Sequence, residues 1–151
     1  MVAPDGSKLD AGVNPRDVPE LAAKRAEEVA MVREMIALWC RGHHAGAAER
    51  GERGGPDVRV RLGRHEVRLC PACAELAAYA TARVGRCPHM GTKTFCSACP
   101  THCYRPEMRE RIREVMRWSG PRMLRYRPVP ALRHAWVSMQ GVIAAKRGRR
   151  G

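Results

Sequence analysis

The sequence predicts a mainly α-helical domain that carries a short β-hairpin and cysteine-rich metal-binding loops. Three observations support this fold class. Apolar residues recur at helical spacing in four stretches, one short stretch alternates as a strand does, and six of the seven cysteines lie between Cys70 and Cys103. Only 5% of the residues are aromatic, so the core must depend on Ala, Val, Leu and Met, and a bound metal would add stability.

The first expected element is a helix over residues 19–41. Pro19 is tolerated in the first turn of a helix, and Gly42 is a residue that can end one. Apolar side chains recur along the stretch at helical spacing: Val29, Val32, Ile36 and Trp39. This helix delivers Cys40 and two following histidines to its C-terminal end.

A change of hydrophobic period predicts a β-hairpin over residues 57–69. Val58, Val60 and Leu62 alternate with arginines, and the pattern resumes after Gly63-Arg64. The second half of this hairpin leads directly into Cys70. That arrangement is typical of zinc ribbons, in which a hairpin delivers the first pair of ligands.

Three more helices are expected towards the C-terminus. The first covers residues 73–84 and is followed by irregular chain to Cys103. The second begins at Pro106 and is expected to end at Ser119-Gly120-Pro121. The last follows Pro128, and its apolar residues stand at i, i+4, i+7 and i+11: Leu132, Trp136, Met139 and Ile143.

These elements predict one domain with unstructured N- and C-terminal segments. Residues 1–16 contain several Pro and Gly and are expected to form a disordered lead-in. Residues 17–145 form a single metal-stabilised domain, within which the Gly-rich stretch 45–56 is a flexible linker. Residues 146–151 form a basic, unstructured tail.

The chain is strongly basic, with a formal net charge of +13. Thirteen Lys/Arg and three Glu lie between Arg105 and the end. Such a tract suits a nucleic-acid backbone or an acidic partner, although a solvated helix face would give the same count. The residues expected to contact phosphates are, besides the tail, Arg109, Arg113 and Arg117.

The N-terminal stretch lacks the apolar segment of a secretory signal, and no apolar run reaches transmembrane length. We therefore expect a cytoplasmic protein with no membrane partner. Thiols stay reduced in that compartment, and seven cysteines cannot all pair with one another. The cysteines are thus predicted to be metal ligands rather than a disulfide framework.

Spacing divides these candidate ligands into two sets of four. The first set is all-thiolate: Cys87, Cys96, Cys99 and Cys103. The second set combines the end of the first helix with the Cys-x2-Cys pair after the hairpin: Cys40, Cys70, Cys73 and either His43 or His44. Mixed Cys/His sets are typical of structural zinc, whereas four thiolates suit either zinc or a [4Fe–4S] cluster.

No catalytic residue is predicted. Glu75 is the only carboxylate between Cys70 and Cys103, so a paired-acid mechanism does not fit there. No histidine is singled out as the partner of a nucleophilic cysteine, and no Gly-rich phosphate loop is present in the sequence. A metal site with an open position would still allow a small molecule to bind or react.

Several strings occur in an order that is similar to one known family. They are Cys40-Arg41-x2-His44, Cys70-x2-Cys73, Lys93-x2-Cys96-x2-Cys99-x2-His102-Cys103-Tyr104 and Ser119-Gly120-Pro121-Arg122-Met123-Leu124. Together with His134, these residues make the stretch 29–136 resemble the nitrous oxide-stimulated promoter family. The resemblance implies a cytoplasmic role in nitrosative stress, a thiolate metal centre and nitric oxide as a candidate ligand. It also favours His44 as the fourth ligand of the second set, with His43 as the alternative. It supplies no reaction.

Three hypotheses follow from the sequence. The first is a non-catalytic, metal-binding protein of the nitric oxide stress response with an iron–sulfur or zinc centre. The second is a metal-stabilised, nucleic-acid-binding regulator that uses its basic C-terminal helices. The third is a metalloenzyme that acts on nitrogen oxides or nitrosothiols.

Overall fold

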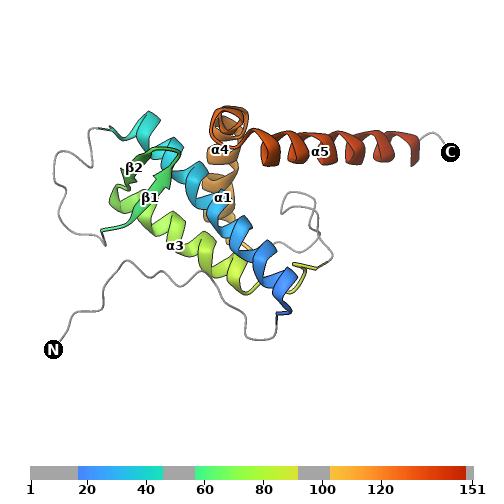
Figure 1. The fold of residues 1–151 in the computed structure, drawn as a ribbon, viewed down its shortest axis with the longest axis horizontal. Helices are drawn as coiled ribbons and strands as arrows, with labels where there is room; N and C mark the ends of the chain where they lie inside the picture. The colour runs from blue at the N-terminus through green and yellow to red at the C-terminus, as the bar shows by residue number, and fades with distance from the viewer. Residues whose placement is uncertain (1–16, 46–56, 92–102, 149–151) are drawn as a thin grey trace.

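The computed structural model describes residues 17–45, 57–91 and 103–148. The lead-in 1–16 and nearly all of the linker 45–56 lie outside these residues. The elements in chain order are α1 (Pro19–His43), β1 (Arg59–Leu62), β2 (His65–Arg68), α3 (Pro71–Gly85), α4 (Pro106–Arg122), the 3-10 turn η2 (Met123–Arg125) and α5 (Pro128–Gly148) (Figure 1). The predicted fold class, mainly helical with a short hairpin, is confirmed.

Helix α1 is the centre of the fold, because α3, α4 and the hairpin all pack against it (Figure 1). The core around it contains many fully buried small side chains: Ala37, Ala74, Ala77 and Ala80. Small side chains let helices approach closely, which fits a chain with few aromatic residues. Three large aliphatic side chains fill the remaining space: Ile36, Leu62 and Val115.

The hairpin is a two-stranded antiparallel sheet with Val60 opposite Val67 and Leu62 opposite His65. Val60, Leu62 and Val67 face the core, whereas the arginines of β1 face solvent. The turn between the strands contains Gly63 at φ 61°, in the left-handed region that favours glycine. The hairpin therefore fixes the position of the chain immediately before Cys70.

A buried arginine near the start of α1 connects that helix to the end of α3. Arg25 pairs with Asp17 at 2.6 Å, and the two side chains are 3% and 4% exposed. The same guanidinium donates hydrogen bonds to the carbonyl oxygens of Val84 at 2.6 Å and Cys87 at 3.2 Å. This contact closes the end of the helix pair that lies farthest from the hairpin.

Three predicted helix ends were wrong, and in each case the helix continues. Helix α1 passes through Gly42 and ends at His43. Helix α4 does not stop at Ser119-Gly120-Pro121 but includes Pro121 and ends at Arg122. Helix α5 reaches Gly148 and so includes the first three residues of the expected tail. None of the helices in the described part of the chain has the length and apolar character that a membrane crossing requires.

Candidate metal centre

Two separate parts of the chain meet at one end of the molecule and bring four ligand groups together. Cys40 lies in the last turn of α1, and His44 follows directly after the helix ends. Cys70 is the residue before α3, and Cys73 lies in the first turn of that helix. The hairpin therefore places the Cys-x2-Cys pair against the C-terminal end of α1.

The geometry of this group fits a tetrahedral ion. The three sulfurs and one ring nitrogen all lie within 4.8 Å of one another. The Nδ1 atom of His44 is 3.5 Å from the sulfur of Cys70 and 3.4 Å from that of Cys73. Tetrahedral zinc with bonds of about 2.3 Å to sulfur and about 2.0 Å to nitrogen would place these atoms about 3.6 Å apart. The group could therefore hold a metal ion without rearrangement of the backbone.

The structure favours His44 over His43 as the fourth ligand. The ring of His43 stacks on Trp39 with 3.8 Å between ring centroids and makes an edge contact with Trp118 at 4.7 Å. Its Nδ1 atom lies 3.1 Å from the backbone oxygen of Trp39. Aromatic packing thus accounts for His43, whereas His44 faces Cys70 and Cys73.

Electrostatics in the metal-free group favour one thiolate rather than three. The pKa of Cys40 is lowered to about 5, mainly because the thiol of Cys73 donates a hydrogen bond to it and secondly because the backbone N–H of Cys70 does so. The pKa of Cys73 is raised by the same hydrogen bond, by burial and by the nearby negative charge. A divalent cation would offset the repulsion between neighbouring thiolates, so that all three cysteines could be deprotonated together.

The three cysteines are buried, with exposed fractions of 2% for Cys40, 6% for Cys70 and 3% for Cys73, and His44 is half-buried. Four protein ligands complete the coordination of zinc, so such a site is closed and structural in character. The group is therefore suited to joining α1, the hairpin and α3.

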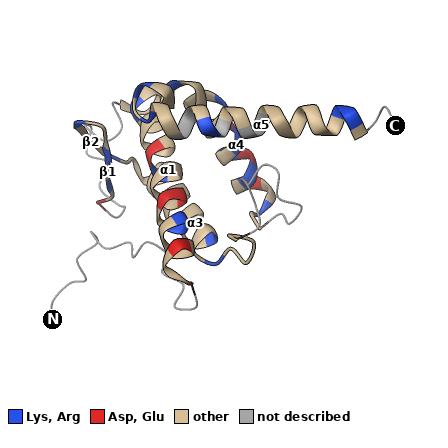
Figure 2. Cartoon of the chain, turned by 45° about the vertical axis from the view of Figure 1, so that its right-hand side comes forward, with Lys and Arg blue, Asp and Glu red and all other residues tan. Residues whose placement is uncertain are grey.

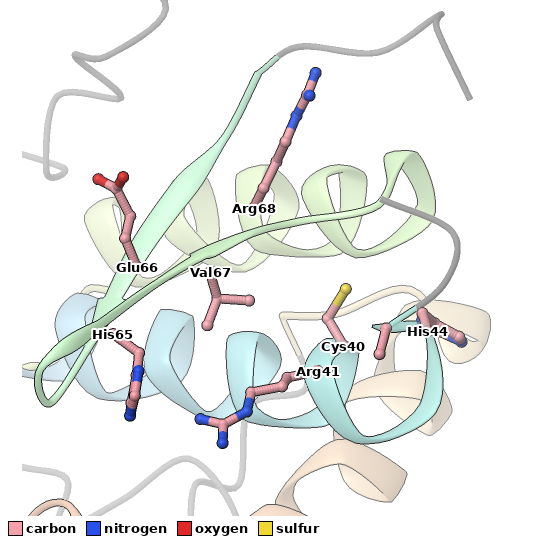
Figure 3. A pocket seen from close by; sticks show the side chains of 8 residues that line it. Cys40, Arg41, His44, His65, Glu66, Val67 and Arg68 are labelled. Atoms are coloured by element: carbon pink, nitrogen blue, oxygen red, sulfur yellow. The ribbon is translucent and has the colours of Figure 1, made fainter. Parts of the chain in front are cut away.

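One side of the group opens into a pocket of about 470 Å³ that Cys40 and His44 line. Arg41 and His65 also line it, and Figure 3 shows the side chain of Arg41 from α1 and that of His65 from the hairpin approaching the same region. Sequence reasoning missed both residues, since no motif links them. Arg68 lies on the other side and pairs with Asp57 at 3.0 Å.

The all-thiolate set is only partly described by the structure. Cys87 is buried in a small cluster with Val29, Val84 and Met90, and Cys103 is half-buried. Cys96 and Cys99 lie outside the described residues. Within 17–45, 57–91 and 103–148, the Cys40/His44/Cys70/Cys73 group is the one candidate cation site found. The all-thiolate set therefore stays a prediction.

The three arginines expected to contact phosphates lie on α4 at positions i, i+4 and i+8, so they share one helix face. Arg113 and Arg117 are exposed and Arg109 is half-buried. Arg113 also pairs with Glu110 at 3.2 Å, which neutralises part of this face. Their contact with nucleic acid stays a prediction.

Comparison with known proteins gives a consistent result. The sequence profile of the nitrous oxide-stimulated promoter family matches residues 23–147. The uncharacterised protein YgbA of Escherichia coli (strain K12) is 44% identical over 59 residues, a stretch that covers 39% of this chain and 50% of that protein. No solved structure matches the chain. Because the profile covers most of the chain, from α1 to the end of α5, this protein belongs to the nitrous oxide-stimulated promoter family.

Proposed function

We propose that this chain is a non-catalytic, zinc-binding protein of the response to nitrogen oxides, and that Cys40, His44, Cys70 and Cys73 hold the metal. The observation that carries the proposal is the convergence of three sulfurs and one Nδ1 atom within 4.8 Å of one another, with two Nδ1–sulfur distances close to those in tetrahedral zinc sites. The family supplies the link to nitrogen oxides.

Zinc is the metal that this ligand set favours. Three thiolates and one imidazole are a common structural zinc set, whereas clusters of the [4Fe–4S] type are usually held by four thiolates. All four protein ligands converge, which leaves no open coordination position for a substrate and argues against the metalloenzyme. The all-thiolate set at Cys87, Cys96, Cys99 and Cys103 would be a second centre, holding zinc or a cluster. A cytoplasmic location would keep both thiol sets reduced.

Metal analysis of protein purified without oxygen tests the proposal. We expect one zinc per chain from the Cys3His site, and any iron with an equal amount of sulfide from the second centre. The His44→Ala variant should lose the zinc, because three thiolates alone bind it more weakly. The matched control is His43→Gln, which changes the adjacent histidine and should keep full zinc occupancy. Full occupancy in His44→Ala, or loss of zinc from both variants alike, would contradict the assignment.

A nitrosothiol tests the connection to nitrogen oxides. Transfer of the nitroso group from a small nitrosothiol to a zinc-bound cysteine forms a new S–N bond, breaks the one in the donor and leaves the donor as a thiolate. The nitrosated sulfur is a poor ligand, so zinc should be released in proportion to the donor added. A chromophoric chelator measures the release. Zinc that stays bound under excess donor would remove nitrosation of this site from the proposal.

A nucleic-acid-binding regulator is the second candidate, favoured by the arginine face of α4. The triple variant Arg109→Gln, Arg113→Gln, Arg117→Gln should weaken binding to duplex DNA and reduce its salt dependence. Arg59→Gln is the control, because Arg59 is paired with Asp57 and Glu66 on the hairpin. Equal losses in both proteins would indicate general basicity instead of a binding face.

A further inference from the structure

Helix α5 exposes an apolar face that no described part of the chain covers. It projects from the helical body (Figure 1) and contacts the rest of the described chain chiefly at η2. Its large apolar side chains are between 43% and 74% exposed: Val129, Leu132, Trp136, Met139, Val142 and Ile143. Side chains of this size and number on one helix indicate an interaction surface.

The spacing of five of these residues, all except Val142, defines a single stripe. From Val129 to Ile143 the intervals are three, four, three and four residues, which places the side chains on one side of an α-helix. At about 100° per residue, Arg133 and Arg147 lie on one border of the stripe and Lys146 on the other. The face is therefore apolar along its middle, with one bordering cation in the first third of the helix and two near its C-terminal end.

The charge of this region distinguishes between kinds of partner. No carboxylate occurs from Val115 to the end of the sequence, while nine Lys/Arg do. Figure 2 shows basic and no acidic residues along α5. A second copy would bring one set of cations against another. The polar side of α5 lacks the row of cations typical of helices that lie on membranes, because its charges are near the two ends.

Ion pairs to α1 fix the chain at the N-terminal end of α5. Arg127, just before α5, pairs with Glu27 and Glu34 of α1, the second at 2.6 Å. The apolar stripe is thus presented on a helix that is already formed, which lowers the ordering cost of binding.

From these observations we propose that α5 docks as an amphipathic helix into an apolar groove with an acidic rim on a partner protein. Val129, Leu132, Trp136, Met139 and Ile143 would be the anchors in the groove. Arg133, Lys146 and Arg147 would meet the acidic rim. This is the helix-in-groove mode of recognition, in which anchors repeat at i, i+3 or i+4 and i+7.

Calcium-loaded calmodulin is a suitable probe, because its Met-rich groove has this chemistry. The full-length, zinc-loaded chain would be titrated with labelled calmodulin and the binding followed by anisotropy. We expect saturable binding that weakens with salt. The double variant Leu132→Ser, Met139→Ser should bind at least about tenfold more weakly, since it removes two central anchors. The control is Ala145→Ser, an exposed position on the opposite side of α5, which should bind as the wild type does.

Three outcomes would overturn the proposal. The first is the absence of binding, or equal binding by the Leu132→Ser, Met139→Ser variant and the wild type. The second is flotation of the wild type, but not of this variant, with anionic phospholipid vesicles, which would assign the stripe to a membrane surface. The third is a dimer in sedimentation that the same variant dissociates, which would assign it to a second copy. Circular dichroism establishes that the variant keeps the helical body folded.

Discussion

Gly42 offers a direct test of how the metal centre is supported. It lies inside α1, between Cys40 and His44, and a Cβ atom there would lie 2.5 Å from Cη2 and 3.0 Å from Cζ2 of Trp118. Those separations are far below ordinary contact distances. The Gly42→Ala variant can therefore fold only if the indole ring moves or the end of α1 shifts away from α4.

The size of the effect follows from two opposing contributions. Alanine in place of glycine within a helix contributes at most about 1 kcal/mol of stability. Overpacking a filled site costs about 1–3 kcal/mol. The ring of Trp118 is held by Arg122 at 3.9 Å, by the edge of Trp39 and by His43, so its displacement disturbs those contacts. When the gain is subtracted from the cost, we expect Gly42→Ala to lower the free energy of unfolding by up to about 2 kcal/mol.

Urea denaturation of the zinc-loaded protein measures this change, and competition with a chromophoric chelator measures zinc affinity. Affinity should fall as well, because Cys40 and His44 lie on either side of the substituted residue. The matched control is Gly141→Ala in α5, where a Cβ would meet no described atom within 4 Å and no proline follows. That variant should be as stable as the wild type or slightly more so. If Gly42→Ala gains as much stability as Gly141→Ala, the steric argument is wrong.

Three further predictions follow. In metal-free protein the pKa of Cys40 is lowered to about 5, so between about pH 5 and about pH 8.5 the unfolded chain holds a proton that the folded chain has released. The free energy of unfolding, measured in urea, should therefore rise over that range. The raised pKa of Cys73 opposes this trend only at higher pH. Chelation of zinc at neutral pH should lower the melting temperature, with recovery on adding zinc but not magnesium. The Asp17→Asn variant should lose about 3 kcal/mol in urea denaturation, because it leaves the buried Arg25 without its charge partner; a loss below about 1 kcal/mol would mean that the carbonyl contacts of Arg25 suffice.

The sequence predicted two helix starts correctly, but it placed the start of α3 at Cys73 instead of Pro71 and ended three helices too early. Pro19 and Pro106 mark helix starts correctly, because proline fits the first turn for a purely local reason. Helix ends depend on packing. Gly42 is helical because its lack of a side chain makes room for Trp118, and Ser119 remains helical while its hydroxyl donates a hydrogen bond to the backbone oxygen of Met35 at 2.9 Å. Contacts of this kind lie far apart in the chain and leave no local pattern.

Spacing placed Cys40, Cys70 and Cys73 in one candidate set, and the structure brings these three together with His44. Two features of the site could not be predicted. His43 and His44 stand side by side after Cys40, so only the packing of His43 on Trp39 separates their roles. The pocket depends on the hairpin approaching the end of α1, and nothing in the sequence brings Arg41 towards His65.

The last turn of α1 connects the metal centre to both C-terminal helices. Cys40 and His44 belong to the centre, and His43 between them packs against Trp118 of α4. Arg41 reaches the hydroxyl of Tyr126, 3.5 Å away, in the turn that leads into α5. A metal that fixes this one turn therefore restrains the side chains on which α4 and the root of α5 rest. The contribution of such a metal to the fold would extend beyond the four ligands, and a reagent that removes it would loosen the support of the exposed helix as well as the hairpin.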